Sequence, residues 1–253
     1  MKSILILIRK DWIESIRSYK FLVLVLVFLL FGFMNPLTAK ILPDIMPQLL
    51  PDNLPIEIPP ATPLDAWTQF FKNMTSMLMI LFFILFSGTL TNEFSKGTMI
   101  PLLTKGLKRQ TVIFAKWGHL VFQWTILFSI NLAASWIYTV LLLPGELNHI
   151  LVACLFLWLY GIFLISLLIF FSVIFMNIYG VLIGLGGVSL LLSLISIAAI
   201  TTPYSPYRLG ADNLLLIYGV LNLSDFIFSL GLTLVLIPIL LVFSIRLLDK
   251  KPL

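Results

Sequence analysis

The sequence predicts an all-α integral membrane protein with six transmembrane helices, and three observations support this fold class. Of its 253 residues, 60% are hydrophobic and only 11% are charged, with a mean hydropathy of +1.09. Soluble domains carry roughly 25% charged residues, so this chain has too few to cover a water-soluble surface. Six apolar stretches have the length of a membrane span, and most Lys and Arg fall on one side when the connections between these stretches are assigned alternately to the two sides.

The spans follow from the length that a helix needs to cross a bilayer. About 20 mostly apolar residues cross roughly 30 Å of hydrocarbon. The stretches that qualify, the second being short, are 21–42, 74–90, 117–143, 150–176, 178–200 and 226–248. A further apolar run at 214–223 is too short to cross, so the segment 201–225 is expected to be extracellular or re-entrant. All of this belongs to one transmembrane domain over residues 1–253.

Residues 1–20 precede the first span and are expected to form an interfacial helix. One helical face is apolar and the opposite face is charged; the residues that define them are Leu5, Ile8, Trp12 and Ile16 against Lys10, Glu14 and Arg17. Charged groups cannot enter hydrocarbon cheaply, and basic ones are attracted to anionic head groups. The alternative is an ordinary helical start to the first span.

The segment 43–73 between the first two spans is rich in proline. It contains seven prolines, which disfavour a continuous helix and favour extended structure. We therefore expect an extracellular loop here. It could be an external cap that contacts a substrate or only a stiff linker.

The distribution of basic residues predicts the orientation. Thirteen Lys and Arg lie on the side of the two termini and of the loop 91–116, and only three lie on the other side. The positive-inside rule then places both termini and this loop in the cytoplasm of a multi-pass protein in the cell membrane. The net charge of +5 is explained by this asymmetry, so no nucleic-acid partner is expected.

Catalytic motifs are missing from the sequence. There is no phosphate-binding loop, no zinc-protease motif and no nucleophile elbow. His119, His149 and Cys154 are too dispersed to form a catalytic or metal site. We expect neither enzyme activity nor a cofactor or metal in this chain.

Ionisable residues are also scarce within the predicted spans, which argues against an ion-driven carrier. The exceptions, Lys40, His119 and Arg246, lie near span ends. The polar residues Gln123, Asn131 and Ser135 are interpreted as interhelical hydrogen-bonding groups.

The loop after the second span contains signals for a short helix over residues 99–105. Thr98 is a good N-cap, Pro101 is tolerated in a first turn and Gly106 is a good stop. The helix would be apolar at Met99, Ile100, Leu102 and Leu103. Such a surface would pack either on the inner ends of the spans or on another protein.

These residues resemble a known family. Glu93, Gly97-Thr98, Leu102-Leu103 and Arg109 resemble the loop after the second span of type 2 ABC transporter permeases. Two other stretches are similar to that family, and the second resembles a subgroup from Gram-positive bacteria: Lys10-Asp11-Trp12, and Asp65-Ala66-Trp67 through Phe70-Phe71-Lys72-Asn73. The chain departs at Gly106, where many relatives have a proline.

The resemblance implies the membrane subunit of an ATP-driven exporter. The loop after its second span would carry the coupling helix that docks on a separate ABC ATPase. This ATPase would be present in two copies and would bind ATP and Mg. The ATPase-coupling residues of the loop would be Glu93, Gly97, Thr98, Met99, Ile100, Leu102, Leu103 and Arg109. A second membrane subunit, identical or paralogous, would meet this one along the second and fifth spans. The residues expected at this dimer seam or along the substrate path are Met77, Leu81, Leu85, Gly184 and Val188. The aromatic and methionine content favours a hydrophobic or amphipathic cargo such as an antimicrobial peptide.

Two other functions stay open at this point. One is a polytopic membrane scaffold, sensor or immunity protein that transports nothing. The other is an ion-coupled carrier, whose transport would continue without ATP.

Overall fold

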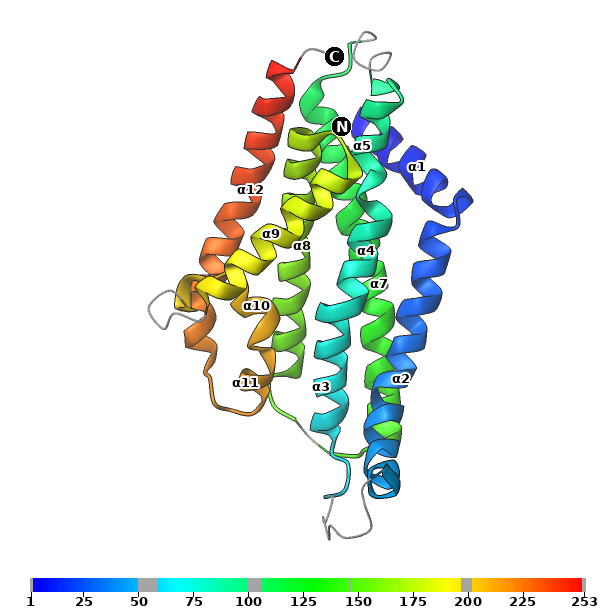
Figure 1. Ribbon diagram of the computed structural model, residues 1–253, viewed down its shortest axis with the longest axis vertical. Helices are drawn as coiled ribbons and strands as arrows, with labels where there is room; N and C mark the ends of the chain where they lie inside the picture. Colours follow the sequence, from blue (N-terminus) through cyan, green and yellow to red (C-terminus); the bar gives the residue numbers. More distant parts are fainter. Residues whose placement is uncertain (1, 50–58, 100–105, 146, 197–201, 252–253) are drawn as a thin grey trace.

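The computed structural model describes residues 2–49, 59–99, 106–145, 147–196 and 202–251, and these residues form a helical bundle without strands (Figure 1). Six of its helical segments are long and apolar enough to cross a membrane. They are 20–45, 63–95, 109–142, 150–175, 178–195 and 223–250. The prediction of an all-α protein with six candidate spans is thus confirmed.

The helices follow one another with short connections. The first half of the chain comprises α1 (Lys2–Arg17), α2 (Lys20–Leu49), α3 (Pro63–Asn73), the π-helix η1 (Met74–Leu78), α4 (Met79–Phe86) and α5 (Gly88–Ser95). The second half comprises α7 (Arg109–Leu142), α8 (Ile150–Phe175), α9 (Ile178–Ile195), the 3₁₀ turn η2 (Thr202–Tyr204), α10 (Arg208–Ala211), α11 (Asn213–Ile217), the 3₁₀ turn η3 (Leu223–Phe226) and α12 (Ile227–Lys250). Together α3, η1, α4 and α5 make up the second span.

Both chain ends and the connection between α5 and α7 lie at one end of the bundle, which we call the terminal end (Figure 1). The connections from α2 to α3 and from α7 to α8 lie at the opposite end. This arrangement agrees with the alternation of basic residues along the sequence.

Helix α1 is separated from α2 by a sharp turn and runs obliquely to it (Figure 1). Tyr19 has φ 60°, the left-handed conformation that often ends helices. The face that α1 packs against the bundle carries Leu7, Asp11 and Ser15, all buried, whereas Leu5 is 65% exposed. The apolar face predicted for this helix therefore packs on the protein only in part, since Trp12 contacts the rings of Phe21 and Phe122 while Leu5 is exposed.

The proline-rich segment 43–73 contains more helix than its composition predicts. Helix α2 continues through Pro36 and Pro43 to Leu49, and α3 begins at Pro63. Each proline removes one backbone donor, a loss that packed helices in membrane proteins tolerate. At α3, proline occupies the first turn, and the Asp65 carboxylate accepts a hydrogen bond from the Thr62 backbone N–H at 2.8 Å. The expected continuous loop is wrong at both of its ends.

Buried polar side chains join the helices, as we predicted for Gln123, Asn131 and Ser135. Asn131 donates to the Phe28 carbonyl at 2.6 Å, Gln123 donates to Ser15 Oγ at 2.6 Å, and Asn35 donates to Ser135 Oγ at 3.2 Å. These bonds link α7 to α1 and α2. In lipid, such bonds and close packing hold helices together because hydrophobic burial gives little driving force.

Burial is uneven among the spans. Helix α8 is central, with 72% of its most apolar window buried, whereas only 11% of the corresponding window of α9 is buried. One side of α9 is thus open to whatever surrounds the protein.

Candidate functional site

Four charged side chains form an ion cluster at the terminal end of the bundle: Lys10, Asp11, Glu93 and Lys116. Lys116 Nζ lies 2.9 Å from Asp11 Oδ1 and 2.8 Å from Glu93 Oε1. Lys10 Nζ donates to the same Glu93 oxygen at 2.7 Å. The cluster therefore fastens α1 and α5, the last part of the second span, to α7.

Most of this ion cluster is shielded from solvent. The side chains of Asp11 and Lys116 are each 4% exposed and that of Glu93 is 11% exposed, whereas Lys10 is 45% exposed. Burial raises the pKa of Asp11, and the neighbouring Lys116 ammonium acts in the opposite direction. The two cations and two anions balance, so losing any one of the three buried charges would leave a net charge in this shielded site.

A polar cavity of about 260 Å³ adjoins the ion cluster, and its wall also includes Asn92, Thr98 and His119. Asp11 Oδ2 and Glu93 Oε2 are buried and have no hydrogen-bond partner among the described residues. Such a cavity is large enough for several water molecules beside these oxygens. The C-terminal end of α5 is thus polar and is bound by ion pairs to α1 and α7, whereas the middle of the second span is apolar.

The residues predicted to couple to an ATPase occupy different environments. Glu93 belongs to the ion cluster; Thr98 Oγ1 donates to the Glu93 carbonyl at 3.4 Å; and Met99 is 1% exposed. Gly97 has φ 64°, and an added Cβ would meet no atom within 4 Å. The predicted helix 99–105 lies largely outside the described residues, as do Ile100, Leu102 and Leu103.

Arg109 stabilises the end of the last helix. Its guanidinium donates to the carbonyls of Leu248 and Lys251, the latter at 3.0 Å. Carbonyls in the last turn of a helix lack intrahelical partners, so this cation caps α12. The start of α7, which follows the 96–108 connection, is thereby fixed to the C-terminal helix.

An apolar groove of about 580 Å³ lies between the second and fifth spans. Residues of η1 and α4 form one wall, α9 forms the other, and Tyr160 and Leu164 of α8 lie behind. None of the described residues that line it is charged. Such a groove suits an apolar ligand.

The residues predicted along the second and fifth spans lie on these two helices, but beside the groove rather than in its wall. Met77 is 54% exposed, while Leu81, Leu85 and Val188 are half-buried and pack on the core. An added Cβ at Gly184 would come within 3.0 Å of the Phe171 ring of α8, which shows packing within the chain at this glycine. The α9 residues that do line the groove include Leu182, Leu185, Gly186 and Ser189.

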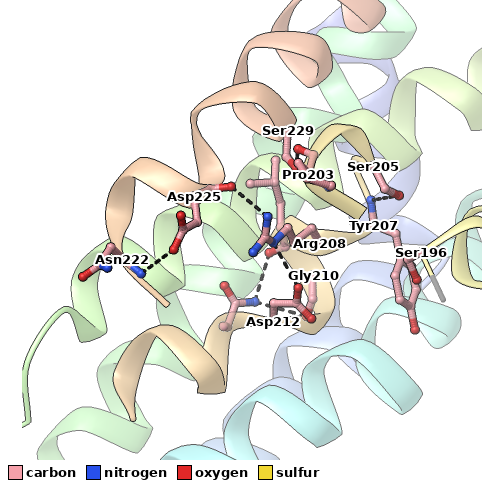
Figure 2. A network of polar contacts seen from close by, with 12 residues as sticks. Ser196, Pro203, Ser205, Tyr207, Arg208, Gly210, Asp212, Asn222, Asp225 and Ser229 are labelled. Atoms are coloured by element: carbon pink, nitrogen blue, oxygen red, sulfur yellow. Dashed lines mark hydrogen bonds and ion pairs between the residues drawn. The ribbon is translucent and has the colours of Figure 1, made fainter. Parts of the chain in front are cut away.

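The segment between α9 and α12 closes one side of the groove and is held by Arg208 (Figure 2). The guanidinium of Arg208 bonds Asp212 Oδ2 at 3.1 Å and the Asp225 carbonyl at 2.8 Å, and it lies 5.0 Å from the ring centre of Phe226. Burial raises the pKa of Asp212, opposed by Arg208. An added Cβ at Gly210 would come within 2.6 Å of Tyr160, so the segment packs closely on α8.

Sequence reasoning missed the ion cluster. Lys116 was counted as a loop residue, but α7 begins at Arg109 and places Lys116 two turns inside a span. The prediction that Lys40, His119 and Arg246 are the charged or titratable exceptions within the spans is therefore incomplete. The sequence feature that could have indicated the cluster is Asp11, a carboxylate next to apolar Trp12 in a helix that precedes a span. A carboxylate buried at such a position needs a cation as its partner.

Among the residues that the structure describes, no group of three or more His, Cys, Asp or Glu side chains is arranged to hold a metal ion. Comparison of the chain with protein-family models, with curated proteins and with solved structures gives no match.

Proposed function

We propose that this chain is the membrane subunit of an ATP-driven exporter of the ABC type, whose ATP and Mg are bound by a separate ATPase chain. The observation that carries the proposal is the ion cluster at the base of the 96–108 connection. Glu93 lies in the last turn of the second span, three residues before this connection, and contacts cations from two other helices. The resemblance of Glu93, Gly97 and Thr98 to an ATPase-coupling loop supports the same conclusion.

The physical basis is mechanical. A force on the connection would displace Glu93, and the buried contacts to Lys10 and Lys116 would pass this displacement to α1 and α7. Breaking these contacts is costly in a low-dielectric site, so the three helix ends move together rather than separately. A docked ATPase could thereby shift several helices through a single loop.

The exposed surfaces agree with an assembly in a bilayer. Leu5 and Ile6 of α1 are 65% and 67% exposed, which suits a helix whose apolar face lies in the interface with its charged side near the head groups. The open side of α9 offers a surface for a second membrane subunit, identical or paralogous. Both termini would then lie in the cytoplasm of the cell, as the basic residues predict.

Two matched variants test this proposal in a complex purified with the ABC ATPase encoded nearest to this chain. Gly97 and Gly219 both have positive φ, 64° and 73°, and neither has an atom within 4 Å of an added Cβ. A valine is strained at either site, so both variants bear a similar local cost. Only Gly97 lies in the proposed coupling connection.

The measurement is the rate at which a thiol reagent modifies Ile84→Cys, a groove residue, in a Cys154→Ala background. We expect ATP to change this rate several-fold in the reference complex and in Gly219→Val, but not in Gly97→Val. The proposal fails if no ABC ATPase copurifies, or if Gly97→Val responds to ATP as Gly219→Val does. The first result would favour a scaffold, sensor or immunity protein. A rate that follows an ion gradient after ATP depletion would favour an ion-coupled carrier.

A further inference from the structure

We propose that the groove between α4 and α9 binds the acyl chain of an anionic lipid, with the anionic head group near Lys72. This inference deepens the proposed function by naming the cargo class, and it rests on that function only for the export step. Binding itself requires neither an ATPase nor nucleotide.

The groove wall offers hydrocarbon rather than hydrogen-bonding groups. Met79, Ile80 and Phe83 of α4 face Leu182 and Leu185 of α9. The hydroxyls of Thr75 and Ser76 donate to carbonyls of their own helix, at 2.8 Å to Phe71 and at 2.6 Å to Lys72. The hydroxyl hydrogens of Thr75 and Ser76 are therefore engaged within the helix and are not free to donate to a ligand.

This chemistry discriminates between two kinds of hydrophobic cargo. An extended peptide carries an unpaired N–H and C=O on nearly every residue, and each costs free energy when it is buried without a partner, while a helical peptide is much wider than a single acyl chain. In the groove wall, the other side-chain hydroxyls are those of Tyr160, Ser189 and Tyr207, too few for a peptide backbone. An acyl chain needs no partner, so it fits better than the antimicrobial peptide favoured by composition.

The length of the groove matches one leaflet. Its wall on the second span runs from Thr75 to Ile84, which is roughly 14 Å at the rise of an α-helix. One leaflet contributes about 15 Å of hydrocarbon. A lipid chain that lies within one leaflet spans about this length.

The groove is open on the bilayer side. Ile80 and Ile84 are 54% and 50% exposed, and an added Cβ at Gly186 would meet no atom within 4 Å. A chain could therefore enter sideways from the membrane. No passage through water is needed.

Lys72 stands where the head group would lie. It precedes Ser76 by one helical turn, on the side of the groove away from the terminal end, and its side chain is exposed. It forms no ion pair within the described residues, and it is the one Lys or Arg between residues 63 and 95. A long lysine side chain near a span end reaches toward the interface, where a carboxylate or phosphate would sit.

A π-helix separates Lys72 from the apolar wall. The segment Met74–Leu78 has this rare geometry, which interrupts α-helices most often at functional sites. It contributes Thr75 and Ser76 to the groove. A local irregularity thus lies at the junction between the proposed head-group and chain sites.

Photo-cross-linking tests the proposal on the chain in nanodiscs without the ATPase. The probe is a fatty acid with a diazirine in the middle of its chain. We expect cross-links within residues 79–84 and 182–189, mapped by mass spectrometry. Lys72→Gln should reduce labelling about twofold to fivefold, as for an exposed ion pair, without reducing labelling by the matching fatty alcohol.

Two adjacent glycines provide the matched pair. An added Cβ meets no atom within 4 Å at Gly186 or at Gly187, but only Gly186 lines the groove. Gly186→Leu should lower labelling about tenfold, the loss expected if roughly two methylenes of the ligand lose their burial. Gly187→Leu should label as the unaltered chain does, and protection of the buried Cys154 from thiol reagents confirms that both variants are folded.

Three results would overturn the inference. They are equal labelling of Gly186→Leu and Gly187→Leu, cross-links concentrated on α12 instead of the groove, and preferential labelling by a hydrophobic peptide carrying the same diazirine. Because no ATPase is present, each of these results is independent of the coupling experiment on Gly97.

Discussion

Replacing Lys116 by methionine should destabilise the protein strongly. Methionine keeps the length of the side chain but removes the ammonium that lies 2.9 Å from Asp11 and 2.8 Å from Glu93. Removing one partner of a buried ion pair costs about 3–5 kcal/mol, since the remaining charge is left in a low-dielectric site. In a protein of this size each kcal/mol lowers the Tm by about 2–4 °C, so Lys116→Met should lower it by roughly 6–20 °C.

The assay uses Cys154, the single cysteine of the chain, which is buried. A thiol-reactive fluorophore in detergent solution reports unfolding when this side chain becomes accessible. Lys108→Met is the matched control: Lys108 is exposed, lies directly before α7 and forms no ion pair among the described residues. Its Tm should change by no more than about 2 °C, as for other surface substitutions.

A rescue variant separates charge from packing. Adding Asp11→Asn and Glu93→Gln to Lys116→Met removes the two carboxylates that Lys116 contacts and with them the excess negative charge of the cluster, and we expect at least half of the lost Tm to return. If Lys116→Met unfolds at the same temperature as Lys108→Met, the ion cluster does not hold the helices together. A triple variant no more stable than Lys116→Met would show that the loss comes from packing instead.

Two further predictions concern packing and orientation. Gly161→Ala should destabilise the bundle by about 1–3 kcal/mol, because the new Cβ would lie 2.4 Å from Trp124. The control Gly231→Ala places a Cβ with no atom within 4 Å and should be neutral or stabilising. Equal Tm values for the two variants would contradict this reasoning. With Cys154 replaced by alanine, Asn148→Cys should react with a membrane-impermeant thiol reagent in intact cells and Lys96→Cys should not; the reverse pattern would invert the topology.

The six spans could be predicted because apolar length is a local property of the sequence. The start of α3 was equally accessible, since Thr62-Pro63 with Asp65 is a typical capping signal, although the proline count outweighed it. The boundaries of the spans were harder to predict from the sequence. Helix α7 begins eight residues before the predicted start of its span, at Arg109, because its polar first turns are paired with α1, α5 and α12.

The ion cluster and the groove depend on tertiary structure. Lys116 is 105 residues from Asp11 and 23 from Glu93, and neither spacing identifies a contact. In the second span, the π-helix Met74–Leu78 changes the 3.6-residue period, so which residues share a face there does not follow from α-helical spacing. The residues named from the resemblance stay predictions for a dimer seam or substrate path, and other residues of the same two spans line the groove.

The ion cluster and the groove lie on one continuous helical span. Glu93 and Ile84 are nine residues apart, or roughly 14 Å along the axis, so a displacement at Glu93 reaches the groove wall through two to three helical turns. Between them, α4 and α5 meet at Ser87, whose hydroxyl donates to the Ile84 carbonyl at 2.9 Å. Hydroxyl-to-backbone bonds of this kind bend helices slightly. Thr91 makes a second such bond, to the Ser87 carbonyl at 3.0 Å. The helix between the groove wall and the terminal end is thus weakened around Ser87, and under the proposed coupling a motion of the loop would change the groove width there.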